Sequence, residues 1–126
     1  MFLERLSAIQ GRIEGAVALS LVDRDGIPVE SVNSSPDLDL EVLAAEMLAQ
    51  VRLVSDHNRE LAVGEVEQFS VTTDKICILV SAVAKEYFLL AVLAPEGNYG
   101  RARFELKRAR LQFENGRKTE MSSRQA

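Results

Sequence analysis

Two runs in the second half of the chain, Ile76–Val80 and Tyr87–Leu93, are apolar at both odd and even positions. Side chains of a β-strand alternate between the two faces of its sheet, so such a run is expected only where both faces are buried. The runs therefore predict a central pair of strands that is sandwiched between helices. Since nothing in them suggests chemistry, function is expected on the outer surface of the molecule.

The remaining segments supply the other elements. Three helices are predicted from apolar spacings of three and four residues, at 2–13, 38–58 and 98–113. Five strands are predicted at 16–22, 27–32, 65–72, 75–83 and 87–94. The pair Asp25-Gly26 indicates a tight hairpin turn between the first two strands. Pro28 has no backbone N–H to donate, so its strand is expected at an edge of the sheet.

Length and composition indicate one domain. The chain has 126 residues, 47% of them hydrophobic and 27% charged, which is ordinary for a globular domain. We expect the folded domain at residues 1–114 and a polar, flexible tail at 115–126. No run approaches the roughly 20 apolar residues of a membrane helix, and the N-terminus does not resemble a signal peptide. A cytoplasmic protein without membrane insertion is therefore expected.

Charge argues against nucleic acid as a partner. The last predicted helix is basic, but the whole chain has a net charge of −4 and a pI near 5.1. Domains that bind nucleic acid are usually basic overall and interleave aromatic residues with their cations. The basic residues are better explained as a solvated face whose later cations complement the helix dipole.

The long central helix carries two apolar stripes. The expected sheet-facing stripe consists of Leu40, Leu43, Ala44, Met47, Val51 and Val54. The opposite stripe consists of Val42, Ala45, Ala49 and Leu53, with Glu46, Arg52 and Asp56 at its rim. Covering a sheet requires only one stripe. The second one predicts a contact with another part of the protein or with a partner.

Residues that could support catalysis or bind a metal are few. Cys77 lies in an apolar strand, and His57 is the only histidine, on the polar side of the long helix. A transition-metal site of the usual kind needs more such ligands. The segment 97–100 contains no P-loop sequence, and Asn98 is explained as a helix cap. Glu65 and Glu67 are predicted on one face of a strand, without a cleft. We therefore expect no catalytic residue, cofactor or metal.

The order of elements resembles the roadblock family of dynein light chains and bacterial small-GTPase regulators of the gliding-motility type. The resemblance covers Phe2 to Phe113. It is carried by Ile13-Glu14-Gly15-Ala16 leading to 21–28, and by the closing segment 98–106.

The resemblance implies an α+β fold, α-β-β-α-β-β-β-α, in which a five-stranded antiparallel sheet has helices on both faces. It also implies a homodimer formed through the third strand, here by Val66, Phe69 and Val71. A small Ras-like GTPase would then dock on the outer stripe of the long helices and be regulated without a catalytic residue from this chain. The residues assigned to that docking are Val42, Ala45, Glu46, Ala49, Arg52, Leu53 and Asp56.

Two other classes of function stay open. A small-molecule sensor module of PAS-like or profilin-like type has a similar size, and it would need a polar group that points into an apolar pocket. An enzyme would need a nucleophile with a base, or paired carboxylates in a cleft.

Overall fold

The structure is a computed structural model that describes residues 2–84 and 86–125, with side chains from residue 3 to residue 112. Its helices are α1 (Phe2–Arg12), α2 (Leu40–Leu61) and α3 (Tyr99–Gln125). Its strands are β1 (Ala16–Asp23), β2 (Pro28–Asn33), β3 (Gln68–Thr72), β4 (Cys77–Ala84) and β5 (Tyr87–Leu93).

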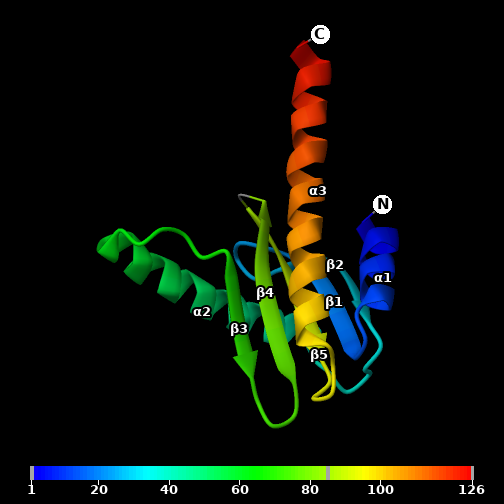
Figure 1. The fold of residues 1–126 in the computed structure, drawn as a ribbon. Helices are drawn as coiled ribbons and strands as arrows, with labels where there is room; N and C mark the ends of the chain where they lie inside the picture. The colour runs from blue at the N-terminus through cyan, green and yellow to red at the C-terminus, as the bar shows by residue number, and fades with distance from the viewer. Residues whose placement is uncertain (1, 85, 126) are drawn as a thin grey trace.

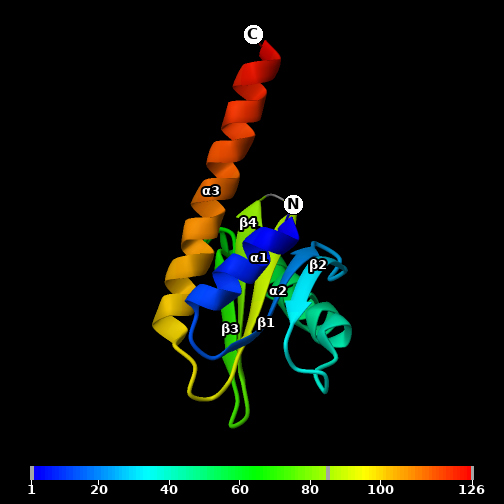
Figure 2. The same cartoon turned by 90° about the vertical axis from the view of Figure 1, so that its right-hand side faces the viewer.

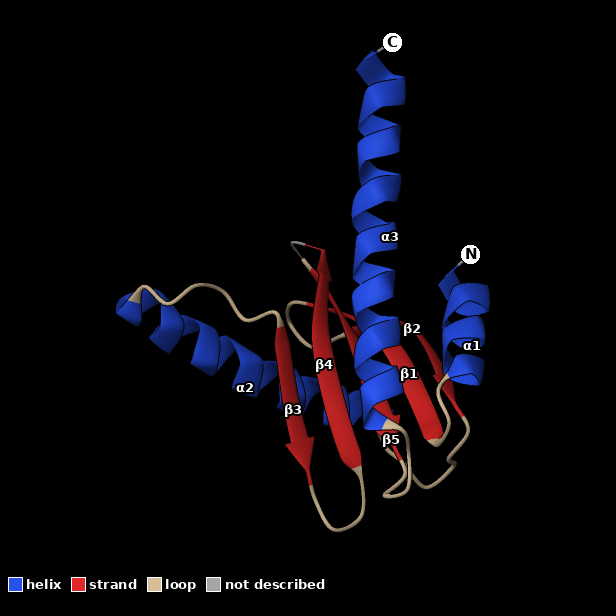
Figure 3. Cartoon of the chain, viewed as in Figure 1, coloured by secondary structure: helices blue, strands red, loops and turns tan. Residues whose placement is uncertain are grey.

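The strands form one antiparallel sheet in the order β2-β1-β5-β4-β3 (Figure 1, Figure 3). The helices α1 and α3 cover one face and α2 covers the other, as the two side views show (Figure 2). The predicted α+β fold is therefore confirmed in the described residues. β2, which contains Pro28, is an edge strand as expected, and the other edge is β3.

A core lies on each face of the sheet, and the central strands contribute to both. On the face of α1 and α3, Leu79, Leu89 and Ala91 pack with helix residues such as Leu6 and Leu106. On the face of α2, Val80, Leu90 and Val92 pack with Ala44 and Leu48. This alternation explains why the runs at 76–80 and 87–93 are apolar at every position.

The β1–β2 turn is fixed by the residues predicted for it. Asp23 Oδ1 accepts hydrogen bonds from the backbone N–H groups of Asp25 (2.9 Å) and Ile27 (3.0 Å). Gly26 has a φ of 87°, a conformation that glycine adopts without steric cost. A Cβ at this position would lie 2.9 Å from Ala45 Cα, so the turn is packed directly against α2.

Several element boundaries differ from the sequence predictions. β3 begins at Gln68, so Glu65 and Glu67 precede the strand and do not share a strand face. α2 continues to Leu61, where Ala62, with a φ of 55°, ends it in a left-handed cap.

α3 also runs further than the sequence suggests. It continues to Gln125, so residues 115–125, which the composition predicts as a polar tail, continue the helix; residue 126 lies outside the described residues. A glycine such as Gly116 costs a helix only about 1 kcal/mol, which its helix-forming neighbours offset.

Candidate functional site

The outer face of α2 is an exposed apolar stripe. Val42 is 56% exposed and Leu53 is 53% exposed, and the small residues Ala45 and Ala49 lie between them. Glu46 and Asp56 are exposed as well. The structure therefore places the predicted docking residues together on the side of α2 that faces away from the sheet. Such an arrangement, an apolar centre with charges at its border, is typical of protein interfaces.

The β1–β2 turn borders this stripe on one side. Arg52 Nη1 donates a hydrogen bond of 2.8 Å to the carbonyl oxygen of Arg24, and the turn residue Gly26 lies against Ala45. Arg52 therefore holds the turn to the helix in addition to lying at the rim of the stripe. No local pattern in the sequence indicates this contact, because it joins residues that are 28 positions apart.

The sheet-facing side of α2 differs in part from the prediction. The buried residues are Leu40, Ala44, Leu48 and Val51, and the prediction omitted Leu48. Their spacings of four, four and three residues describe one helical stripe and are visible in the sequence. Leu43, Met47 and Val54 are only half-buried at its flank.

β3 leaves one row of backbone groups without a strand partner. The carbonyl of Glu67 accepts from Ala82 N at 2.9 Å, and Thr73 N donates to the carbonyl of Ile76 at 2.8 Å. Backbone groups of an antiparallel strand alternate in direction, so odd-numbered residues between these two face β4. The backbone groups of Gln68, Ser70 and Thr72 therefore point away from the sheet. An edge of this kind is a ready template for another strand.

The predicted dimer residues lie on the α2 side of this edge. Phe69 and Val71 pair with Val80 and Ile78, both in the core under α2. Phe69 and the preceding Val66 pack against that core and are half-buried. The opposite face of β3 is polar. There Ser70 Oγ accepts a hydrogen bond of 3.2 Å from Tyr99, and Gln68 Oε1 accepts one of 3.2 Å from Arg103.

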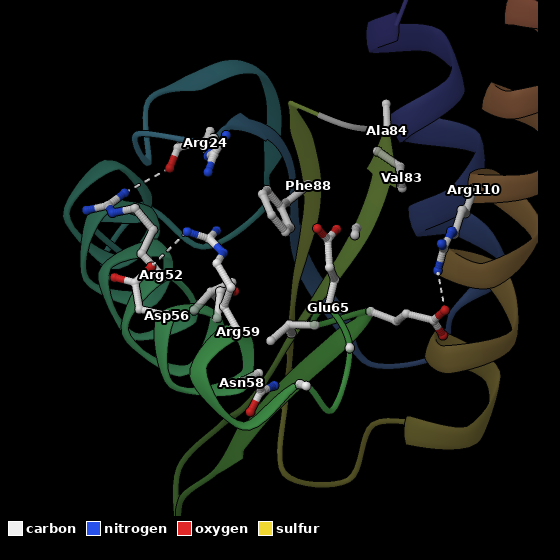
Figure 4. A pocket seen from close by; sticks show the side chains of 17 residues that line it. Arg24, Arg52, Asp56, Asn58, Arg59, Glu65, Val83, Ala84, Phe88 and Arg110 are labelled. Atoms are coloured by element: carbon white, nitrogen blue, oxygen red, sulfur yellow. Dashed lines mark hydrogen bonds and ion pairs between the residues drawn. The ribbon is translucent and has the colours of Figure 1, made fainter.

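The last turns of α2 extend beyond the sheet. No residue of α2 after Val51 is buried, and Figure 1 shows this end of the helix projecting past β3. An open hollow of about 1010 Å³ lies between these turns, residues 64–67 and the ends of β4 and β5 (Figure 4). Phe88 and Val66 contribute apolar surface to it, and Arg52, Arg59 and Glu65 contribute charges.

A buried carboxylate joins α1 to α3 on the other side of the sheet. The side chain of Glu105 is fully buried, and Arg12 Nε lies 3.0 Å from Oε2. Arg101 Nη2 lies 2.7 Å from Oε1, and Arg108 approaches the same oxygen to 4.0 Å. The sequence does not reveal this group, since a single Glu in a basic helix carries no recognisable signal. Its contacts indicate that it positions the two helices.

The structure shows where the two polar residues singled out in the sequence, His57 and Asn98, lie. His57 is exposed, and Asn98 caps α3 by accepting a 2.9 Å hydrogen bond from Arg101 N. Among the described residues, no group of three or more His, Cys, Asp or Glu side chains could hold a metal ion. None of the described helices is long and apolar enough to cross a membrane. The stripe on α2 and the edge of β3 are both open surfaces of the described part of the chain.

Comparison with known proteins agrees with this architecture. Residues 3–94 match the Roadblock/LC7 domain model. The structure of MglC from Myxococcus xanthus is 30% identical and superposes with a TM-score of 0.66, covering 91% of this chain and 98% of that one. A Roadblock/LC7 domain from Streptomyces avermitilis has a TM-score of 0.78 at 18% identity, covering 94% and 97%.

The gliding protein MglB from Thermus thermophilus has a TM-score of 0.74 at 18% identity, covering 86% of this chain and 84% of that one. No curated protein matches the sequence. The family model covers more than half of the chain and includes α1 from residue 3, all five strands of the described sheet and α2. The chain therefore belongs to the Roadblock/LC7 domain family.

Proposed function

We propose that this chain forms a homodimeric, non-catalytic platform that binds and regulates a small Ras-like GTPase in the bacterial cytoplasm. The observation that carries the proposal is the exposed stripe of Val42, Ala45, Ala49 and Leu53, which lies on a helix whose other side already covers the sheet. The similarity to MglC and to the gliding protein MglB supports a role of the gliding-motility type.

The open edge of β3 supports the dimer. Its outward backbone groups can continue the sheet into a second copy, and the projecting end of α2 would then cover the added strand. Such pairing brings the two α2 stripes onto one surface, which doubles the apolar area offered to a partner.

The sensor alternative has less support. Its polar group would have to point into an apolar pocket, whereas the hollow beside α2 is open and carries charges. The buried hydroxyl of Ser20 in β1 is already paired with Ser31 Oγ at 2.7 Å.

The proposal is tested by placing a charge in the stripe. Ala49→Arg puts a long cation at the middle of the apolar surface without touching the sheet-facing side of α2. We expect it to weaken binding of a small Ras-like GTPase, loaded with a nonhydrolysable GTP analogue, by about 30-fold or more, as loss of a central interface contact does. Calorimetry or a pull-down measures the effect.

The matched control is Ala8→Arg, the same substitution at an exposed position of α1. It should bind like the wild type. Both variants should keep the oligomeric state and the unfolding midpoint of the wild type. Equal affinity of Ala49→Arg and Ala8→Arg for the GTPase would show that the stripe is not the docking surface.

A further inference from the structure

We propose that the two copies pair their β3 strands in an antiparallel register centred on Ser70. This inference rests on the proposed homodimer and adds which residues face each other across the two-fold axis. It also assigns the partner's Lys75 to the mouth of the hollow beside α2.

The hydrogen bonds of β3 restrict the choice of register. The main-chain groups of Gln68, Ser70 and Thr72 point outward, and those of Phe69 and Val71 bond to β4. In an antiparallel pair, outward groups of one strand must lie directly opposite outward groups of the other. The two-fold axis therefore passes through a residue, and the positions near the middle of the strand are Phe69, Ser70 and Val71.

The side chains distinguish these three positions. With the axis at Ser70, Phe69 lies opposite the partner's Val71 on the α2 face, and this contact occurs twice. On the other face Gln68 lies opposite the partner's Thr72. Apolar residues thus meet apolar ones, and polar residues meet polar ones, which is the pairing that stabilises sheets.

The two alternative axes, at Phe69 and at Val71, each place an apolar residue opposite a polar one. With the axis at Phe69, Val71 would face the partner's Glu67, and in each copy the Glu67 carboxylate already lies 3.5 Å from Arg110. With the axis at Val71, Phe69 would face the partner's Thr73. In either alternative the residue on the axis, Phe69 or Val71, meets its own copy, while the other apolar residue faces a polar one. Two apolar contacts on the α2 face are therefore formed only with the axis at Ser70.

Charges beyond the ends of β3 favour the same register. An axis at Ser70 brings the partner's turn at 73–76, which contains Lys75, beside the segment 64–67, which contains Glu65, because both lie beyond the same end of the paired strands. Both side chains are exposed, and neither forms an ion pair among the described residues. Figure 4 shows the Glu65 carboxylate pointing into the hollow. The partner's turn at 73–76 would therefore lie at the mouth of this hollow, with its cation toward Glu65.

Cysteine pairs on the polar face of β3 test the register, with the Cys77→Ala chain as the reference for any effect on the core. Gln68→Cys, Ser70→Cys and Thr72→Cys are made in a Cys77→Ala background, so that only the introduced thiols react. Directly opposite, hydrogen-bonded residues have Cα atoms about 5.5 Å apart, within the range of a disulfide. An offset of two residues adds about 6.8 Å along the strand and takes the pair out of range.

For an axis at Ser70, mild oxidation of Ser70→Cys alone should shift the protein to twice the monomer mass on a non-reducing gel. A mixture of Gln68→Cys and Thr72→Cys, one of them carrying a mass tag, should form the mixed disulfide. If Ser70→Cys instead linked only to Gln68→Cys, or only to Thr72→Cys, the register would be overturned and the homodimer would stand.

Light scattering of the reduced wild type separates the two proposals. A monomer at high micromolar concentration would overturn the homodimer together with the register. If the protein is a dimer but none of these cysteine combinations forms a disulfide, the pairing through β3 is overturned and the homodimer stands.

Charge reversal gives an independent readout. Glu65→Lys and Lys75→Glu should each raise the dimer dissociation constant about two- to fivefold for each of the symmetry-related contacts between these residues. The double variant should recover the wild-type value. Additive losses in the double variant would contradict the assigned contact between these residues.

Discussion

At the scale of single residues, one glycine allows the backbones of two loops that are distant in the sequence to come into contact. Gly15 has a φ of 83°, and a Cβ on it would lie 2.4 Å from Gly97 Cα. Its carbonyl accepts from Ala94 N at 2.8 Å, and the carbonyl of Glu14 accepts from Asn98 N at 2.9 Å. The loop before β1 is therefore fixed to the loop before α3 through main-chain contacts that leave no space for a side chain.

Gly15→Ala should lower the free energy of unfolding by about 1–3 kcal/mol from the strained backbone alone. The collision with Gly97 should increase this loss, since neither backbone can move freely. Gly11→Ala is the matched control, because Gly11 lies in α1 and a Cβ added there would meet no atom within 4 Å. It should raise stability by up to about 1 kcal/mol. Urea unfolding measures both, and equal midpoints for the two variants would contradict the close contact.

Glu105, whose carboxylate is buried, is the second residue at which a substitution should change the stability of the fold. Glu105→Gln removes the negative charge while Arg12, Arg101 and Arg108 remain around it. We expect a loss of about 1–3 kcal/mol, because the amide cannot satisfy the arginines as the carboxylate does. Glu96→Gln, at an exposed position before α3, should be neutral. Denaturant unfolding compares them, and a neutral Glu105→Gln would show that the cluster does not stabilise the fold.

At the scale of elements, β3 is an edge strand whose outward backbone groups face no other strand of the described sheet. Ser70→Pro removes an outward N–H and places the proline ring in the path of a neighbouring strand, a position that an edge strand tolerates in the monomer. The variant should shift the proposed dimer toward monomer in size-exclusion chromatography with light scattering. Ser70→Ala keeps the N–H and loses only the contact with Tyr99. It should remain dimeric, and a dimeric Ser70→Pro would exclude this edge from the interface.

The sequence predicted the elements well where they bury regular patterns. The strands around Leu79 and Leu90 and the turn at Gly26 followed directly from local composition. It failed where long-range contacts decide the outcome: the contact between Arg52 and the carbonyl of Arg24 joins two elements, and the cluster around Glu105 joins α1 to α3. The continuation of α3 past Gly116 was missed because glycine and polar composition only weakly oppose a helix.

At the scale of the whole molecule, α3 divides into a part that covers the sheet and a part that extends beyond it (Figure 2). Leu106 and Ala109 are buried in the core. We propose residues 1–114 as the unit that folds on its own. A chain ending after Glu114 should keep the unfolding midpoint of the full chain to within a few degrees.

A chain ending after Glu105 is the comparison, since it lacks Leu106 and Ala109. Loss of a buried leucine in this position should destabilise the domain by about 2–5 kcal/mol. Thermal unfolding followed by circular dichroism measures both truncations. A large loss of stability in the chain that ends after Glu114 would place the domain boundary further along α3.

The strand order has a consequence for synthesis on the ribosome. β1 lies between β2 and β5, and Ala16 pairs with Leu93, a separation of 77 residues. The first hairpin can form early, but it cannot bury its inner edge until the last strand has emerged. Contacts between such distant parts of a chain slow folding, and exposed strand edges attract other chains in the meantime. A nascent chain of this protein therefore keeps an aggregation-prone edge of β1 exposed until β5, which ends at Leu93, can pair with it.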